Sequence, residues 1–457
     1  MVYIRFLLAL AAWTCAGAGL VAAFRSRSRP VWRLQFLALS YILGFGAVGL
    51  ASVLVMMCGI HLGPWLPVAM AAIGVGLYFR FRPVWDASRD TLSRVLPGYV
   101  VAGGAAVLVF LAAISSDHLQ GDGAEFWGLK ARSIERAGTF RNPDFTSEVR
   151  PHRHAGYPLL LPSTYAWIYS ATGSYSERPI RISLAIFFLA SLAVVSAELR
   201  ERLPGPLASW MTALYAWIPA FTRPATGIAD GYCDYPLAIF ILIGLIQARR
   251  WLERPEIGSA ILSAVALACA GQSKDEGAAF AVLALVLFPI FGAAARGPVG
   301  ALRAAAIPAV GLPALALWFW IRQSFVPDPE LLTAATGFDA LRIPGVVYWL
   351  GWNLAKVQKW SLMWPAVLAL LILRFPRPKN HESLLAWGGL GILAMYVGVW
   401  TLMPAQGARA AMEGNAVRLI LHSVPLLFVW SARMLGATRA RNVELNPSAC
   451  NPFSRTS

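Results

Sequence analysis

Long apolar runs recur along most of the chain and are separated by short polar segments. Many of them approach about 20 residues, the length that an α-helix needs to cross the hydrocarbon core of a bilayer. Because backbone N–H and C=O groups cannot stay unpaired in lipid, such runs are expected to be helical. The pattern therefore predicts an all-α polytopic membrane protein.

The apolar runs predict about thirteen transmembrane helices. They cover residues 4–24, 36–57, 62–79, 97–115, 179–197, 207–222, 235–248, 257–272, 278–294, 304–322, 360–374, 384–403 and 417–435. Residues 1–96 hold the N-terminal transmembrane helices, and residues 97–435 form a region that carries most of the polar chemistry. Residues 436–457 are predicted to be a disordered tail. Two segments between spans are unusually long, Ser116–Arg178 and Gln323–Lys359.

The distribution of basic residues predicts how the chain is oriented in the membrane. The 457-residue chain has a net charge of +16, although only 14% of its residues are charged. The arginines gather in alternate short loops, near residues 25–33, 80–94, 249–254 and 374–379. Because basic residues beside spans stay on the cytoplasmic side, these loops and the tail are predicted to be cytoplasmic and the N-terminus external. Topology accounts for the charge, so no nucleic-acid partner is expected.

The first long segment, residues 116–178, is predicted to be a structured loop on the external face. It contains GDGAEFWGLKA (Gly121–Ala131), a polar cluster in a chain whose mean hydropathy is +0.58. Apolar positions from Phe126 to Ala137 recur at helical intervals, which is typical of an amphipathic helix in the membrane interface. Residues 156–169 are apolar but too short to span, and they predict a second interfacial helix.

Four polar clusters fall on the same predicted external face. Ionisable groups near the ends of membrane helices cost free energy unless they are paired or solvated, so they often mark a site. Orientation rules explain arginines on the cytoplasmic face, but they do not require clusters that mix acids with bases. The members of the clusters are Asp122, Glu125 and Lys130; Asp230 and Asp234; Lys274, Asp275 and Glu276; and Arg409, Glu413, Asn415 and Arg418.

Carboxylates and cations that meet in one place suit group transfer at a phosphate-linked centre. One carboxylate, Asp122 or Glu125, would take the proton of the attacking group, and lysine or arginine would neutralise the departing phosphate. This chemistry requires no cofactor. Asp122, Glu125 and Asp234 could also share a divalent metal ion, although their spacing does not demand one. The cysteines show no metal-binding or redox spacing.

Structural roles compete with these functions in the long loop. Asp122 could cap the helix that starts near Glu125, and Glu125 could complement the dipole of that helix. Lys130 could simply extend its ammonium group toward lipid headgroups. Aromatic side chains at this level, Trp127 and Tyr157 among them, are as typical of the membrane-interface belt as of a substrate contact.

Structural roles also compete in the later clusters. Asp234 precedes Tyr-Pro at the start of a predicted span, where an aspartate often caps the helix. Lys274 could form a structural ion pair with Asp275 or Glu276. Arg418 lies about one turn inside an apolar span, where an unpaired guanidinium is costly, and this favours a contact with an anion.

These segments resemble parts of the GT-C superfamily of glycosyltransferases. The similarity is to bacterial members related to the protein O-mannosyltransferases, the lipid A aminoarabinose transferase and the lipopolysaccharide-core galacturonosyltransferases. It extends in patches from about residue 97 to residue 435. The residues that carry it are Asp122 with Trp127-Gly-Leu-Lys-Ala, Tyr157-Pro158 with Pro162, Asp234 in Tyr232–Ala238, Glu276 in Lys-Asp-Glu-Gly, and Asn415–Arg418 before Pro425.

The resemblance implies a GT-C bundle with periplasmic juxtamembrane helices in a bacterial inner (plasma) membrane, with the active site facing the periplasm. The donor would be a polyprenyl-phosphate-linked sugar, the acceptor a lipid, glycan or protein, and the anomeric centre would invert. Asp122 matches the loop acid that acts as catalytic base, and Glu125 is the second candidate. The substrate-binding candidates are Trp127, Lys130, Tyr157, Asp234, Lys274, Glu276 and Arg418.

The sequence departs from the GT-C pattern in two ways. Many members place the large loop directly after the first span, whereas three predicted spans precede it here. Many also carry adjacent acids, whereas Gly123 and Ala124 separate Asp122 from Glu125. The second departure leaves open which of the two acids is the base.

Two other functions fit parts of the sequence. A lipid-linked glycan polymerase or ligase tends to rely on an arginine-rich outer loop with a histidine, and the run Arg150–His154 has that composition. A lipid or sugar transporter would carry inverted repeats and ionisable residues at mid-membrane depth. Most acids in this chain lie at the ends of predicted spans, which favours the transferase hypothesis.

Overall fold

The helices of the protein account for nearly all of its regular structure. The computed structural model describes residues 1–25, 31–85, 92–146, 156–222, 228–325, 340–402 and 416–445. In these ranges the only extended pairing is an isolated bridge between Val31 and Trp85. The prediction of an all-α protein is confirmed for this part of the chain.

Seven helices of the described residues are long and apolar enough to cross a membrane. They are α1 (Val2–Phe24), α2 (Arg33–Met57), α4 (Leu92–Ile114), α8 (Arg178–Arg200), α11 (Asp234–Glu253), α13 (Asp275–Ala309) and α18 (Ser383–Leu402). Shorter apolar helices are α3 (Trp65–Arg80), α12 (Ile257–Gly271), α17 (Met363–Leu373) and the first part of α21 (Val424–Leu445). These helices support a multi-pass membrane protein, but a bundle of thirteen spanning helices is not confirmed.

Prolines and glycines explain why some predicted spans are divided. The predicted span 207–222 is broken into α9 (Gly205–Ala216) and α10 (Pro219–Thr222), because a proline disfavours helix at the residue before it. The spans predicted at 278–294 and 304–322 fall on α13 and α14 (Leu312–Phe325). α13 continues through a sharp break at Arg296 and Gly297, where Gly297 has a φ of +67° before Pro298.

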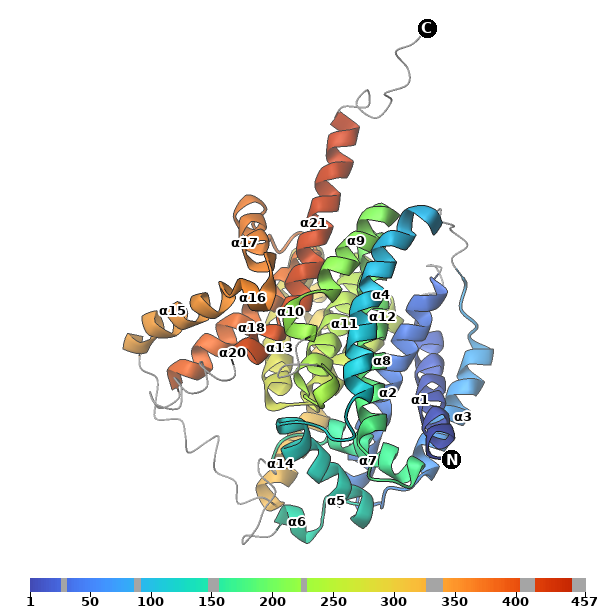
Figure 1. Cartoon of the computed structure of the whole chain (residues 1–457). Helices are drawn as coiled ribbons and strands as arrows, with labels where there is room; N and C mark the ends of the chain where they lie inside the picture. The colour runs from blue at the N-terminus through green and yellow to red at the C-terminus, as the bar shows by residue number, and fades with distance from the viewer. Residues whose placement is uncertain are drawn as a thin grey trace.

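The segment predicted as a long external loop folds into helices at one end of the bundle. It contains a π-helical turn η1 (Gly123–Gly128), α5 (Leu129–Ala137), α6 (Pro143–Thr146) and α7 (Leu160–Thr172). Figure 1 shows α5, α6, α7 and the N-terminus at the lower end of the bundle, with α21 leaving the upper end. Both helices predicted in this segment are therefore present.

Two details of that segment differ from the prediction. On α5, Leu129 is 45% exposed, whereas Lys130 on the expected polar side is fully buried. The reason is that the Lys130 ammonium lies over two aromatic rings inside the protein. α7 is buried along nearly its whole length and packs against α1, α2 and α5, so its surroundings are mostly protein.

The C-terminal part completes the bundle. It contains η4 (Ala340–Arg342), α15 (Ile343–Leu354), α16 (Val357–Trp360) and α20 (Ala416–Leu421) besides α17, α18 and α21. α21 continues to Leu445, nine residues past the predicted start of the tail at 436, and no proline interrupts it between Pro425 and Pro447. Residues 446–457 of the predicted tail lie outside the described residues.

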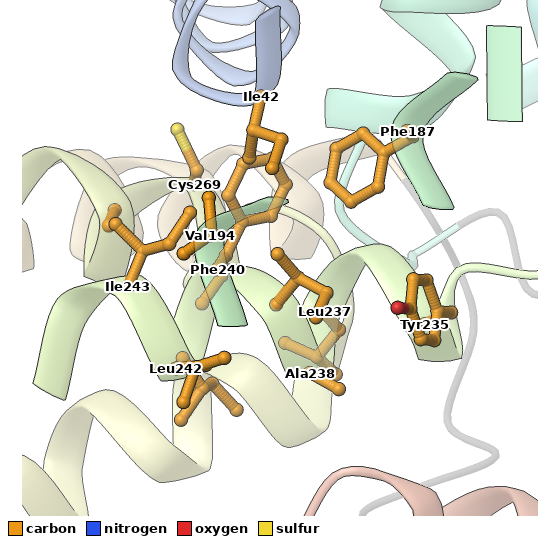
Figure 2. Packing of buried hydrophobic residues seen from close by; sticks show 14 of the residues in the cluster. Ile42, Phe187, Val194, Tyr235, Leu237, Ala238, Phe240, Leu242, Ile243 and Cys269 are labelled. Carbon is orange, nitrogen blue, oxygen red and sulfur yellow. The ribbon is translucent and has the colours of Figure 1, made fainter. Parts of the chain in front are cut away.

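Helix α11 is the centre of the core. From Tyr235 to Ile246 it is apolar on all sides, as expected of a helix surrounded by protein. Figure 2 shows Leu237, Phe240 and Ile243 of α11 among Ile42, Phe187, Val194 and Cys269, which come from α2, α8 and α12. α11 also contacts α13, α18, α20 and α21. Its position fixes the residues at its two ends, Asp234 and Arg249.

The N-terminal helices approach closely through glycines. A Cβ added to Gly17 would lie 1.8 Å from the Ser40 carbonyl oxygen, and one added to Gly44 would lie 2.0 Å from that of Trp13. Small residues let membrane helices pack backbone to backbone, where dispersion and weak contacts hold them together. These glycines therefore set the separation of α1 and α2.

Replacing Gly44 with alanine is expected to lower the free energy of unfolding by about 1–3 kcal/mol, because the backbones of α1 and α2 must move apart. Thermal unfolding of the purified protein in detergent measures this effect. Gly103→Ala is the matched control, since a Cβ at Gly103 of α4 meets nothing within 4 Å. Equal unfolding temperatures for the two variants would show that the close contact is not needed.

Candidate functional site

The first residue of α11, Asp234, is the buried centre of a charged cluster. Its Oδ1 accepts hydrogen bonds from Lys274 Nζ at 3.0 Å and from His422 Nε2 at 3.1 Å. Its Oδ2 accepts from Arg418 Nε at 3.0 Å and Nη2 at 2.8 Å. A buried carboxylate is stable only when it is paired and hydrogen-bonded, and here both oxygens are occupied. Asp234 therefore positions three side chains that come from later segments of the sequence.

Arg418 connects this buried carboxylate to the long loop. While Nε and Nη2 bind Asp234, Nη1 forms an ion pair with Asp122 Oδ2 at 2.7 Å. The guanidinium also lies over the ring of Tyr232, 4.3 Å from its centre. The Asp122 side chain is 31% exposed and that of Asp234 only 4%. Asp122 is thus the accessible acid of the pair that shares Arg418.

Lys274 contributes a second buried cation. Its ammonium lies between Asp234 and Glu276, with the second ion pair at 2.9 Å. Burial lowers the pKa of Lys274, but the two carboxylates outweigh burial and hold the pKa above its ordinary range. Lys274 therefore stays positively charged at any physiological pH, as a group that binds anions must.

Two aromatic residues, Trp127 and Tyr157, lie beside this cluster. Trp127 and Tyr157 are stacked with ring centres 5.9 Å apart, and Lys130 Nζ lies 5.6 Å and 5.7 Å from their centres. Burial raises the pKa of the Tyr157 hydroxyl, and the nearby carboxylate of Glu276 raises it further. Tyr157 is therefore a neutral hydrogen-bonding group next to the charged cluster.

The π-helical turn explains how the loop reaches α11. A Cβ added to Gly123 would lie 1.9 Å from the Asp230 carbonyl oxygen, so only glycine permits this approach. Gly121 has a φ of +50°, a conformation that favours glycine. Asp122 lies between these two glycines and is the residue before the turn, yet its side chain makes no capping hydrogen bond. The capping role weighed for Asp122 is absent, and its carboxylate instead faces Arg418.

The structure brings eight of the nine candidate residues into one region at one end of the bundle. The ninth, Glu125, lies on the same π-helical turn as Trp127, where it is exposed. The ion pair that was weighed for Lys274 and Glu276 is present. Asp230 lies apart from the cluster in η3 (Ile228–Asp230), where it pairs with Arg181 at 3.2 Å. The roles assigned to these residues stay predictions.

Two partners in the cluster were not anticipated from the sequence. His422 donates to Asp234 through Nε2, and its Nδ1 accepts from the Tyr396 hydroxyl at 2.5 Å. His422 follows Arg418 by four residues, so helical spacing already placed the two on one face. Nothing comparable marked Tyr396, which is an aromatic residue in the apolar helix α18.

A further ion pair borders the cluster on the side of α14. Arg322 Nη1 binds Asp275 Oδ1 at 3.1 Å and donates to the Gly156 carbonyl at 3.2 Å. It joins the start of α13 to the segment before α7. Asp275 and its neighbour Glu276 therefore have different partners, Arg322 and Lys274.

Several sequence-based candidates fall outside the described residues. They are the run Arg150–His154, which favoured a polymerase or ligase, and Arg409, Glu413 and Asn415 of the fourth cluster. Among the residues that the structure does describe, no group of three or more His, Cys, Asp or Glu side chains is arranged to hold a metal ion. Asp122 and Asp234 share the Arg418 guanidinium instead, and metal dependence stays a prediction to be tested.

Comparison of the chain with protein-family models, with curated proteins and with solved structures gives no match.

Proposed function

We propose that this protein is a membrane glycosyltransferase that moves a sugar from a polyprenyl-phosphate donor to a lipid, glycan or protein acceptor. The bacterial inner membrane and a periplasm-facing site belong to the same proposal. The observation that carries it is the pairing of one accessible carboxylate, Asp122, with Arg418, which the buried Asp234 holds in place. An acid and an anchored cation side by side are the two groups that such a transfer requires.

In this proposal, the Asp122–Arg418 ion pair is present before the donor binds. Arg418 offers two nitrogens to Asp234 and one to Asp122. Guanidinium groups bind phosphate oxygens strongly, so the donor phosphate competes with Asp122 for Nη1. Donor binding would then release the Asp122 carboxylate to accept a proton. Asp234 keeps Arg418 in position throughout.

The reaction is a single displacement at the sugar C1. Asp122 takes the proton of the acceptor hydroxyl, whose oxygen forms the new bond to C1. The bond from C1 to the phosphate oxygen breaks at the same time, and its electron pair leaves with the polyprenyl phosphate. Arg418 and Lys274 neutralise the phosphate that departs. Attack from the face opposite to the leaving group inverts the anomeric centre.

Burial around the cluster serves the same reaction. Lys130, Trp127 and Lys274 are buried, and their surroundings exclude bulk water. A site without free water limits hydrolysis of the donor and strengthens charge interactions. The stacked pair Trp127–Tyr157 would border the sugar or the first part of the lipid.

The proposal is tested with the full-length protein in nanodiscs. Undecaprenyl-phosphate derivatives of mannose, glucose, galacturonic acid and aminoarabinose are supplied with a bacterial envelope extract as acceptor. We expect one of them to yield free undecaprenyl phosphate together with an acceptor that gains one sugar mass, both measured by mass spectrometry. Repeated addition of glycan units would instead support a polymerase or ligase. Uptake of a donor into vesicles without bond formation would support a transporter.

A further inference from the structure

A second cluster of charged residues lies at the opposite end of the bundle. Asp234 and Arg249 are both on α11, and their separation of fifteen positions corresponds to about 22 Å along a helix. α18 connects the same two ends, since Glu382 immediately precedes it and Tyr396 lies near its other end. The second cluster is therefore distinct from the candidate catalytic site.

The second cluster joins four arginines and four glutamates through ion pairs. Arg433 binds both oxygens of Glu382 at 2.7 Å, and Arg249 binds Glu198 and Glu201 at 3.0 Å. The arginines are Arg202, Arg249, Arg250 and Arg433, and the glutamates are Glu198, Glu201, Glu253 and Glu382. The four positive and four negative charges of this network compensate each other.

A cavity of about 780 Å³ opens beside this network. Arg202, Glu382 and Arg433 of the network form part of its lining. Arg374 and Arg377, from the segment between α17 and α18, complete the charged lining, which thus holds four arginines and one glutamate. The cavity therefore attracts an anion, and its volume lies in the range of small-molecule sites.

The same cavity has an apolar side. Ile372, Leu373 and Phe375 line it and are 73%, 74% and 67% exposed. They continue the apolar surface of α17, the helix that ends at Leu373. Arginines next to exposed apolar side chains at the end of a membrane helix match a molecule with an anionic head and hydrocarbon tails.

We infer that this cavity binds the phosphate-bearing headgroup of an anionic membrane lipid. Arg374 and Arg377 contact the phosphate, with Arg202 nearby, and the acyl chains run along the apolar face of α17. The buried network fixes Arg433 and Glu382, which also line the cavity. This site is independent of the sugar-transfer proposal, because it lies at the other end of the bundle.

The test measures lipid binding by the delipidated full-length protein in neutral detergent. Phosphatidylglycerol is added, and bound copies are counted by native mass spectrometry while thermal unfolding is followed in parallel. We expect phosphatidylglycerol to raise the unfolding temperature. The double variant Arg374→Gln/Arg377→Gln is expected to bind it about 30-fold more weakly, since two phosphate contacts are lost.

Three comparisons decide the result. Arg80→Gln/Arg82→Gln removes two exposed arginines, one at the end of α3 and one just after it, and should leave binding unchanged. Diacylglycerol, which has the same tails without phosphate, should not raise the unfolding temperature. Inorganic phosphate should do so only weakly, because it lacks the tails. Equal binding by both double variants would overturn the assignment to this cavity. A full effect from diacylglycerol or from inorganic phosphate would overturn the assignment to a lipid headgroup.

Discussion

Replacing Asp122 with asparagine is expected to lower the rate of sugar transfer by about 10²–10⁴-fold, the usual contribution of a general base. Asparagine keeps the size of the side chain but cannot accept the proton of the acceptor hydroxyl. Because the Asp122 side chain is partly exposed, loss of its ion pair with Arg418 should change stability little. The measurement is turnover of the identified donor and acceptor by purified protein in nanodiscs. The loss should appear in kcat, with KM for the donor unchanged or lower.

Two control variants make this result specific. Asp117→Asn removes another exposed acid of the same segment, which pairs with Arg178 at 3.0 Å and not with the cluster, and should retain wild-type turnover. Glu125→Gln removes the second candidate base, whose side chain is exposed on the π-helical turn. Near-normal turnover of Asp122→Asn, combined with a large loss in Glu125→Gln, would transfer the role of base to Glu125.

That the site residues lie close together could be predicted from the sequence, because the number of spans determines which span ends share one face of the membrane. Asp234 and Lys274 lie at the ends of apolar runs that return to the same face, so their proximity follows from counting spans. Which side chains of the cluster pair with each other could not be predicted by counting spans. Which oxygen of Asp234 binds which cation depends on helix rotation, and that is set by packing of many side chains. Tyr396 shows the limit, since nothing in the sequence of α18 distinguishes it.

The fold was predicted well where apolar runs are continuous and less well where prolines and glycines interrupt them. α2 and α8 agree with the predicted spans within a few residues, because a run of about 20 apolar residues has one stable conformation in lipid. The predicted spans 278–294 and 304–322 do not coincide with α13 and α14, since Gly297 turns the chain inside what is otherwise one helix. The buried position of Lys130 was also unpredictable, because it depends on contact with Tyr157, which is distant in sequence.

Replacing Arg249 with methionine is expected to lower the free energy of unfolding by about 3–5 kcal/mol, the usual effect of removing one partner from a buried ion pair. The Arg249 side chain is fully buried and contacts four carboxylates, those of Glu198, Glu201, Glu253 and Glu382. Methionine fills a similar volume, but it leaves the network with one uncompensated negative charge in a region shielded from water. The apparent unfolding temperature in detergent should fall by roughly 5–10 °C.

A control and a double variant separate charge balance from the loss of side-chain contacts. Arg254→Met removes an exposed arginine at the end of the same helix and should leave the unfolding temperature unchanged. Glu198→Gln combined with Arg249→Met restores equal numbers of opposite charges, so the double variant should lose less stability than the sum of the two single variants. Strict additivity would show that these two residues contribute independently, and the network would then not act as one unit. A smaller loss than the sum would show that the two residues are energetically coupled. The end of the bundle opposite the candidate site would then be stabilised by the charge balance of the whole network, and not by any single ion pair.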